Sequence, residues 1–126
     1  MRNLARAALL GAALVQLCGS ARATDKGLVI RGGQCSADAF IKGAESGDEK
    51  YISGLSANCT TATQDKAQYV NYIAGMGVYA QYCVAQLAGL QLRNVVITND
   101  PTQADPLHCK LAGKPADIAA ALTKYP

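Results

Sequence analysis

The sequence predicts a small all-α domain in residues 24–126, with one long central helix and two disulfides. Three observations predict this class. Apolar residues after position 64 recur every three or four positions, four cysteines follow the N-terminal apolar segment, and no strongly alternating strand pattern occurs. The many small residues also suit close packing of helices.

The N-terminal segment has the layout of a secretory signal. Two arginines precede an apolar stretch, residues 7–17, that contains no acidic residue. This stretch is too short to cross a bilayer core of roughly 30 Å, and Ala21-Arg22-Ala23 offers the small residues that cleavage after Ala23 requires. We therefore expect a signal peptide at 1–23. The mature chain is expected to be periplasmic or secreted, without a membrane anchor.

Size and charge restrict the mature part further. Residues 24–126 have the length of one domain. Cleavage would remove Arg2, Arg6 and Arg22 from the 12 basic residues, so the remaining basic residues would balance the 9 acidic ones. Because no cluster of Lys or Arg remains, nucleic acid is not an expected partner.

The mature chain carries four cysteines: Cys35, Cys59, Cys83 and Cys109. In an oxidising compartment an even number favours two disulfides, each of which stabilises a small domain by about 2–4 kcal/mol. Three pairings are open. We prefer Cys35 with Cys59 and Cys83 with Cys109, because each pair closes two adjacent helical segments. The short C-x-x-C pairs of a zinc site are missing, so no metal is expected.

The first elements are expected to be two short helices. Ser36 is a suitable N-cap for a helix over 36–41. A second helix is expected over 48–55, where acidic residues at the start favour the helix dipole.

The long helix is expected to begin after the hydroxyl-rich segment 60–63, which can cap it. Seven apolar residues would share one face: Tyr69, Ile73, Met76, Ala80, Cys83, Leu87 and Leu90. Three glycines interrupt this pattern at 75, 77 and 89, which indicates either a kink or the close approach of another backbone.

The C-terminal part mixes clear and ambiguous signals. Segment 90–98 fits a strand by its β-branched residues and a helix by its spacing. Segment 101–114 contains two prolines and a glycine and is expected to be a loop. Pro115 then begins a final helix over 115–124 that buries Ile118, Ala121 and Leu122.

Few residues carry chemistry. His108 is the only histidine, and a Cys-His pair would need a free thiolate. Phosphate-loop, nucleophile-elbow and zinc-protease motifs do not occur. We therefore expect no catalytic residue, no metal and no cofactor. Tyr72 and Tyr79 lie off the apolar face and are the candidate partner-binding residues. The alternative is that they pack under the short helices. Exposed tyrosines and a seam of small residues would also permit a homodimer.

Several short motifs follow one another in the second half of the chain: Tyr72-Ile73-Ala74-Gly75-Met76, then Cys83, then Leu92-Arg93-Asn94-Val95-Val96, Asp100-Pro101 and a closing segment from Ala116 to Pro126. In this order they resemble the Rap/Tai immunity family. The resemblance implies a small periplasmic helical protein that binds a toxic cell-wall amidase delivered by a type VI secretion system and blocks its cleft. A role of this kind requires no catalytic residue.

Two other functions remain open. A periplasmic chaperone or stress-response binding protein would expose apolar surface to many clients, although only one histidine could sense mild acid. A small secreted enzyme would need a free thiol or a metal at His108.

Overall fold

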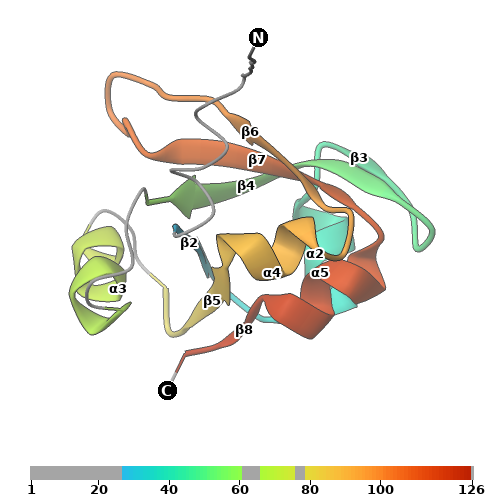
Figure 1. The fold of residues 1–126 in the computed structure, drawn as a ribbon, viewed down its shortest axis with the longest axis horizontal. Coiled ribbons are helices and arrows are strands. Elements are labelled where there is room, and N and C mark those ends of the chain that lie inside the picture. The colour runs from blue at the N-terminus through green and yellow to red at the C-terminus, as the bar shows by residue number, and fades with distance from the viewer. Residues whose placement is uncertain (1–26, 61–65, 76–78, 126) are drawn as a thin grey trace, which may run out of the picture.

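The fold is a mixed α/β structure built on one antiparallel sheet. A computed structural model describes residues 27–60, 66–75 and 79–125. Seven strands form the sheet in the order β6-β7-β4-β2-β5-β8, and β3 pairs with β4 beside this row (Figure 1). The predicted all-α class is therefore wrong.

The strands are β2 (Leu28–Gly32), β3 (Ser46–Gly47), β4 (Ile52–Cys59), β5 (Tyr82–Gln86), β6 (Val96–Asn99), β7 (His108–Gly113) and β8 (Thr123–Lys124). The helices are α2 (Ala37–Gly43), α3 (Lys66–Ala74), α4 (Leu87–Gln91) and α5 (Pro115–Ala121).

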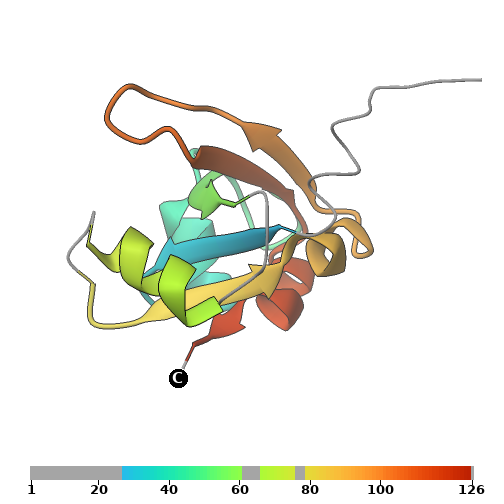
Figure 2. The same ribbon diagram turned by 60° about the vertical axis from the view of Figure 1, so that its left-hand side comes forward.

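The helices divide between the two faces of the sheet. One face packs against α2, α4 and α5, and this larger core includes Phe40, Leu55, Leu90, Leu111, Ile118 and Leu122, all 0% exposed. The other face packs only against α3, through a smaller core of Leu28, Ile30, Val70, Ile73, Tyr82 and Val84. Figures 1 and 2 show α3 apart from the other three helices. Because α3 covers only part of its face, the strands beyond it present polar side chains.

Two of the expected helices are confirmed. Ser36 caps α2, and its hydroxyl accepts a hydrogen bond from the backbone N–H of Ala39 at 3.1 Å. Pro115 begins α5, which ends at Ala121 rather than at residue 124. Ile118 and Leu122 are buried as expected, whereas Ala121 is only partly buried.

The expected long helix is wrong because three elements occupy its length. Helix α3 ends at Ala74, strand β5 runs over Tyr82–Gln86, and α4 follows directly. Strand β5 lies inside the sheet and is covered on both faces. Its residues 82–85 are consequently all buried, without the alternation that marks a half-exposed strand. The apolar residues of β5 lie between the apolar residues of α3 and α4 in the sequence. Together they showed a continuous spacing of three and four, which predicted a single long helix.

The helix expected over 48–55 is wrong as well, because this segment forms the turn of a hairpin and the start of β4. Asp48 accepts the backbone N–H groups of Lys50 and Tyr51 in the turn. The pairing of β4 with β7 shifts between Ile52 and Leu55, and Gly54 lies there with a φ of +73°. This bulge changes the spacing of buried residues from two to three, which imitates a helix.

Two further segments, 90–98 and 101–114, each contain part of a strand. Segment 90–98 contains both elements, since α4 ends at Gln91 and β6 begins at Val96. The loop expected over 101–114 is wrong beyond residue 107, because His108–Gly113 form β7 between β4 and β6.

The signal peptide expected at 1–23 lies outside the described residues. None of the helices among the described residues has the length and apolar character of a membrane span.

Candidate functional site

The candidate site lies on the face of the sheet that α3 only partly covers. On β4 and β7, four of the residues that point away from the larger core are polar: Ser56, Asn58, His108 and Lys110. They form two cross-strand pairs, since Asn58 lies opposite His108 and Ser56 lies opposite Lys110. The alternation of the two strands thus puts a polar strip beside the apolar patch under α3.

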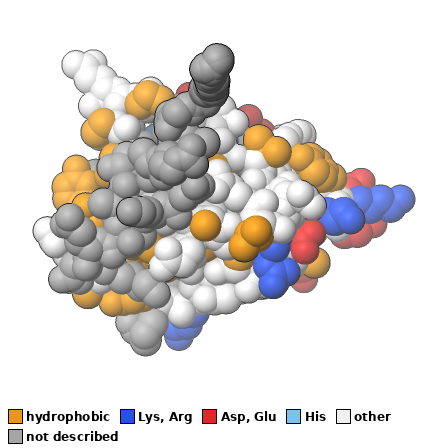
Figure 3. Space-filling model, viewed as in Figure 1, with side chains coloured by type: hydrophobic (Ala, Val, Ile, Leu, Met, Phe, Trp, Pro, Cys, Tyr) orange, Lys and Arg blue, Asp and Glu red, His pale blue; other side chains and the backbone are white. Residues whose placement is uncertain are grey.

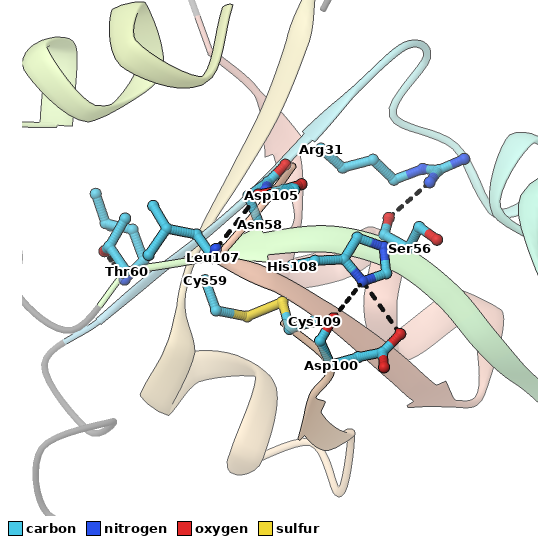
Figure 4. The surroundings of a disulfide bond; sticks show 11 residues. Arg31, Ser56, Asn58, Cys59, Thr60, Asp100, Asp105, Leu107, His108 and Cys109 are labelled. Atoms are coloured by element: carbon cyan, nitrogen blue, oxygen red, sulfur yellow. Dashed lines mark hydrogen bonds and ion pairs between the residues drawn. A yellow bond between two sulfur atoms is a disulfide. The ribbon is translucent and has the colours of Figure 1, made fainter. Parts of the chain in front are cut away.

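His108 is held in place by Asp100. The Nδ1 atom of His108 lies 3.1 Å from the backbone oxygen of Asp100 and 3.3 Å from its Oδ2 (Figure 4). These contacts fix the orientation of the imidazole ring through its Nδ1 atom. A general base would also need a nucleophile in reach, and His108 has no hydrogen bond to a hydroxyl or thiol among the described residues.

A second polar pair joins β4 to the loop before β7. The side-chain amide of Asn58 donates to both carboxylate oxygens of Asp105 at 2.7 Å. Asp105 also accepts the backbone N–H of Leu107 at 3.3 Å. The carboxylate is therefore occupied by neutral donors, and it fixes the loop against the sheet.

Lys110 takes part in a charged group at the exposed end of the strip. Its ammonium donates to Glu45 Oε2 at 2.6 Å and lies 3.6 Å from Asp100 Oδ2. The hydrogen bond to Glu45 raises the pKa of Lys110 above its ordinary value. In Figure 3, charged side chains gather at the end of the molecule where the β3–β4 hairpin lies.

Arg31 stands at the end of β2 and extends along the sheet. Its Nη1 donates to the backbone oxygen of Ser56 at 2.7 Å, and the side chain is partly buried. Burial lowers the pKa of Arg31 because the guanidinium loses water, while the nearby Tyr79 phenol acts in the opposite direction. Arg31 takes part in none of the ion pairs between described residues.

A cavity of about 220 Å³ opens between the polar strip and α3. Tyr79 leans over Gly32, where a Cβ would lie 2.2 Å from the Tyr79 ring, so only glycine permits this approach. Tyr79 also meets Tyr82 edge to face with ring centroids 5.8 Å apart. Residues that line the cavity include Arg31, Asn58, Ile73, Tyr79, Tyr82 and His108.

The two predicted partner-binding tyrosines do not share a helix. Tyr72 lies on α3 and Tyr79 lies in the segment before β5. Their side chains are nevertheless exposed, Tyr72 by 52% and Tyr79 by 59%. Tyr79 lines the cavity, whereas Tyr72 precedes the cavity residue Ile73. Both side chains are therefore accessible to a partner, although they do not lie on one helix as the sequence indicated.

The four predicted cysteines form two disulfides, but the preferred pairing is wrong. The bonds are Cys35–Cys83 and Cys59–Cys109. The first ties the segment before α2 to β5, and the second links the neighbouring strands β4 and β7 (Figure 4). The preferred pairing assumed that helices adjacent in sequence are adjacent in space. With all four sulfurs in disulfides, none of these cysteines supplies a thiolate.

Most cavity residues had no signal in the sequence. Arg31, Asn58, Asp105 and Tyr82 lie far apart along the chain and belong to no catalytic motif. A correct assignment of β4 and β7 would have placed Asn58 opposite His108, but the sequence does not fix how the two strands pair.

Comparison of the chain with protein-family models, with curated proteins and with solved structures found no match.

Proposed function

We propose that this chain is a periplasmic immunity protein that binds a toxic cell-wall amidase and inhibits it without catalysing a reaction. The observation that carries the proposal is the exposure of Tyr72 and Tyr79, the second of which lines the cavity. A tyrosine that is half exposed in the unbound domain offers a large rigid contact surface, and tyrosines are enriched among the residues that dominate binding energy.

The disulfides support the compartment that this role requires. Two disulfides in a domain of this size are consistent with folding in an oxidising compartment, outside the cytosol. The expected signal peptide supplies the route there. The periplasm, as the compartment where a cell-wall amidase acts, is the specific part of the proposal.

The proposal does not rest on a helical fold shared with the Rap/Tai family. The motif segments of that resemblance lie on different kinds of element here, since 72–74 ends α3 and Val96 begins β6. What remains of the resemblance is the set of short motifs, the export signal and the paired cysteines. The binding surface is inferred from this chain's own tyrosines.

Capture and inhibition test the proposal. The oxidised domain, residues 24–126, is used to capture proteins from lysates of related bacteria that carry active type VI systems. One stoichiometric amidase, whose cleavage of peptidoglycan stops when the domain is added, supports immunity. Many substoichiometric clients indicate the chaperone alternative and contradict the proposal.

Alanine variants locate the surface. Tyr72→Ala and Tyr79→Ala should each weaken amidase binding by about thirtyfold, as for a residue that contributes about 2 kcal/mol. Tyr51→Ala is the matched control, because Tyr51 is 49% exposed but lies at the β3–β4 hairpin. Equal losses for all three variants, or a loss only at Tyr51, would contradict the proposed surface.

A further inference from the structure

Asp105 places a carboxylate at the cavity without a cation beside it. Asp105 lines the cavity, and it takes part in none of the ion pairs between described residues. Its hydrogen-bond donors are neutral: Oδ1 accepts from the Asn58 amide and the Leu107 backbone N–H, and Oδ2 accepts from the Asn58 amide. Each carboxylate oxygen offers about two acceptor positions. Oδ2 therefore retains a position for a further donor, and the negative charge is not neutralised.

The Tyr79 ring lies on the same face of the sheet as this carboxylate. Strand alternation directs the Asn58 side chain to the face where α3 lies, because its neighbours along β4 belong to the larger core, and the Asp105 carboxylate is bonded to it there. Gly32 pairs with a β5 residue of the smaller core, so a Cβ on Gly32 would point to this face, where it would meet the Tyr79 ring. Ile73 lines the cavity from α3. The cavity thus combines a negative charge with an aromatic and an aliphatic side chain.

The positive charges near the cavity do not neutralise this carboxylate. The Arg31 side chain leaves β2 toward the other face of the sheet, where Nη1 donates to the backbone oxygen of Ser56 and Nη2 lies against α2. Figure 4 shows the Arg31 guanidinium turned away from Asp105. His108 also lines the cavity, but Asp100 Oδ2 lies 3.3 Å from its Nδ1 and offsets the charge that the ring carries when protonated. The electrostatics of the cavity therefore favour a cation over an anion.

We propose that the cavity binds a primary alkylammonium group. The ammonium donates a hydrogen bond to Asp105 Oδ2, and the alkyl chain packs against Ile73 and the ring of Tyr79. A guanidinium fits less well, because its fork bonds to both carboxylate oxygens at once, and Oδ1 already accepts two hydrogen bonds. The volume of about 220 Å³ limits the length of the chain, since a cavity of roughly 150 Å³ holds benzene. The n-pentylammonium ion has as many non-hydrogen atoms as benzene and is of the expected size.

The probe is n-pentylammonium, and 1-pentanol is its neutral analogue of the same length. Each is titrated at pH 7 into the oxidised mature domain labelled with ¹⁵N. The ammonium should shift the amide signals of Gly32, Ser56, Asn58 and Tyr79 with a dissociation constant of roughly 1–10 mM. The alcohol should bind at least about tenfold more weakly, because it forms no charge-assisted hydrogen bond with Asp105.

An alkylammonium group can come from a free amine or from a lysine side chain of a protein. Lysine blocked at both ends, as N-acetyl-lysine methylamide, distinguishes the two sources. Binding of the blocked lysine as tight as that of n-pentylammonium assigns the cavity to a lysine side chain, whereas binding of n-pentylammonium alone assigns it to a free amine. Neither titration depends on the amidase partner, so a failed amidase capture leaves this result unaffected.

Two variants assign the binding to the proposed contacts. Asp105→Asn should weaken n-pentylammonium binding by about tenfold or more, as expected for a hydrogen bond to a charged group. Asp48→Asn is the matched control, because Asp48 also accepts backbone N–H groups in a turn but lies at the β3–β4 hairpin and does not line the cavity. Tyr79→Leu should weaken binding by about threefold, since it keeps an apolar side chain and removes the ring that attracts a cation.

Several results would overturn the proposal. They are equal affinity for n-pentylammonium and 1-pentanol, no binding of n-pentylammonium at about 50 mM, shifts confined to residues outside the cavity, or equal losses for Asp105→Asn and Asp48→Asn. If Asp105→Asn fails to fold, the comparison of n-pentylammonium with 1-pentanol and the Tyr79→Leu variant still decide the question.

Discussion

Removing either disulfide should destabilise the domain by a similar and large amount. The bonds close loops of nearly equal length, with sequence separations of 48 for Cys35–Cys83 and 50 for Cys59–Cys109. For a loop of about 50 residues, the chain-entropy relation gives about 4 kcal/mol of stabilisation. This is a large part of the roughly 5–15 kcal/mol that holds a small domain folded. The two loops overlap along the chain. A path between the cysteines of one bond that runs through the other bond is still no shorter than the direct segment of chain between them.

The test compares the variants Cys35→Ala/Cys83→Ala and Cys59→Ala/Cys109→Ala with the unmodified domain. The free energy of unfolding is measured by urea titration with far-ultraviolet circular dichroism at pH 7. Both variants should lose about 4 kcal/mol and differ from each other by less than about 1 kcal/mol. A loss below about 1 kcal/mol in either variant would refute the entropic reasoning. A large difference between them would mean that the native packing of one bond, and not its loop length, sets the effect.

The pairing itself can be checked on the same protein before any variant is made. Trypsin cleavage after Arg31, Lys42, Lys50, Lys66, Arg93 and Lys110 places each cysteine in a separate peptide. Without reduction, mass spectrometry should find peptide 32–42 joined to 67–93, and peptide 51–66 joined to 94–110. Peptide 32–42 joined to 51–66 would instead restore the pairing preferred from the sequence and contradict the structure.

Three further perturbations probe the sheet, each measured by urea unfolding. Leu111→Ala should lower the free energy of unfolding by about 2–5 kcal/mol, because Leu111 is 0% exposed in the larger core. A loss below about 1 kcal/mol would contradict its burial. Thr60→Val should lower the free energy of unfolding by about 1–3 kcal/mol. The Thr60 hydroxyl accepts a hydrogen bond from the buried backbone N–H of Leu28 at 3.0 Å, and valine would leave this N–H unpaired. An unchanged free energy of unfolding would exclude this hydrogen bond. Lys110→Met tests the ion pair between Lys110 and Glu45. The pKa of Lys110 in the folded domain is raised above the ordinary value of 10.5. The ion pair therefore stabilises the domain fully below pH 10.5, and this stabilisation is lost as the pH rises through the folded pKa. The stability difference between Lys110→Met and the unmodified domain should therefore shrink above pH 10.5, and a difference that grows there would reverse the sign of the argument.

Local signals were sufficient where an element is stabilised by its own residues. Ser36 caps α2 and Pro115 begins α5, because an N-cap hydroxyl and a fixed proline φ act within one turn of the chain. The even cysteine count likewise predicted two disulfides, although not which cysteines pair.

Local signals failed where burial depends on both faces of the sheet. Strand β5 has Cys83 and Ala85 in the larger core, with Tyr82 and Val84 in the smaller one. No periodicity distinguishes such a strand from a buried helix. The bulge at Gly54 hid strand β4 in a similar way, because it interrupts the alternation of buried and exposed residues along the strand.

The sequence by itself determined which cysteines form the bridges and where two of the helices begin. Only the tertiary structure decided that the chain forms a sheet, that Cys35 meets Cys83, and that Arg31 and Tyr82 line one cavity. The physical reason is that strand pairing joins residues distant in the chain. Its hydrogen bonds are made by backbone groups that every residue but proline carries, so they leave little trace in the side chains.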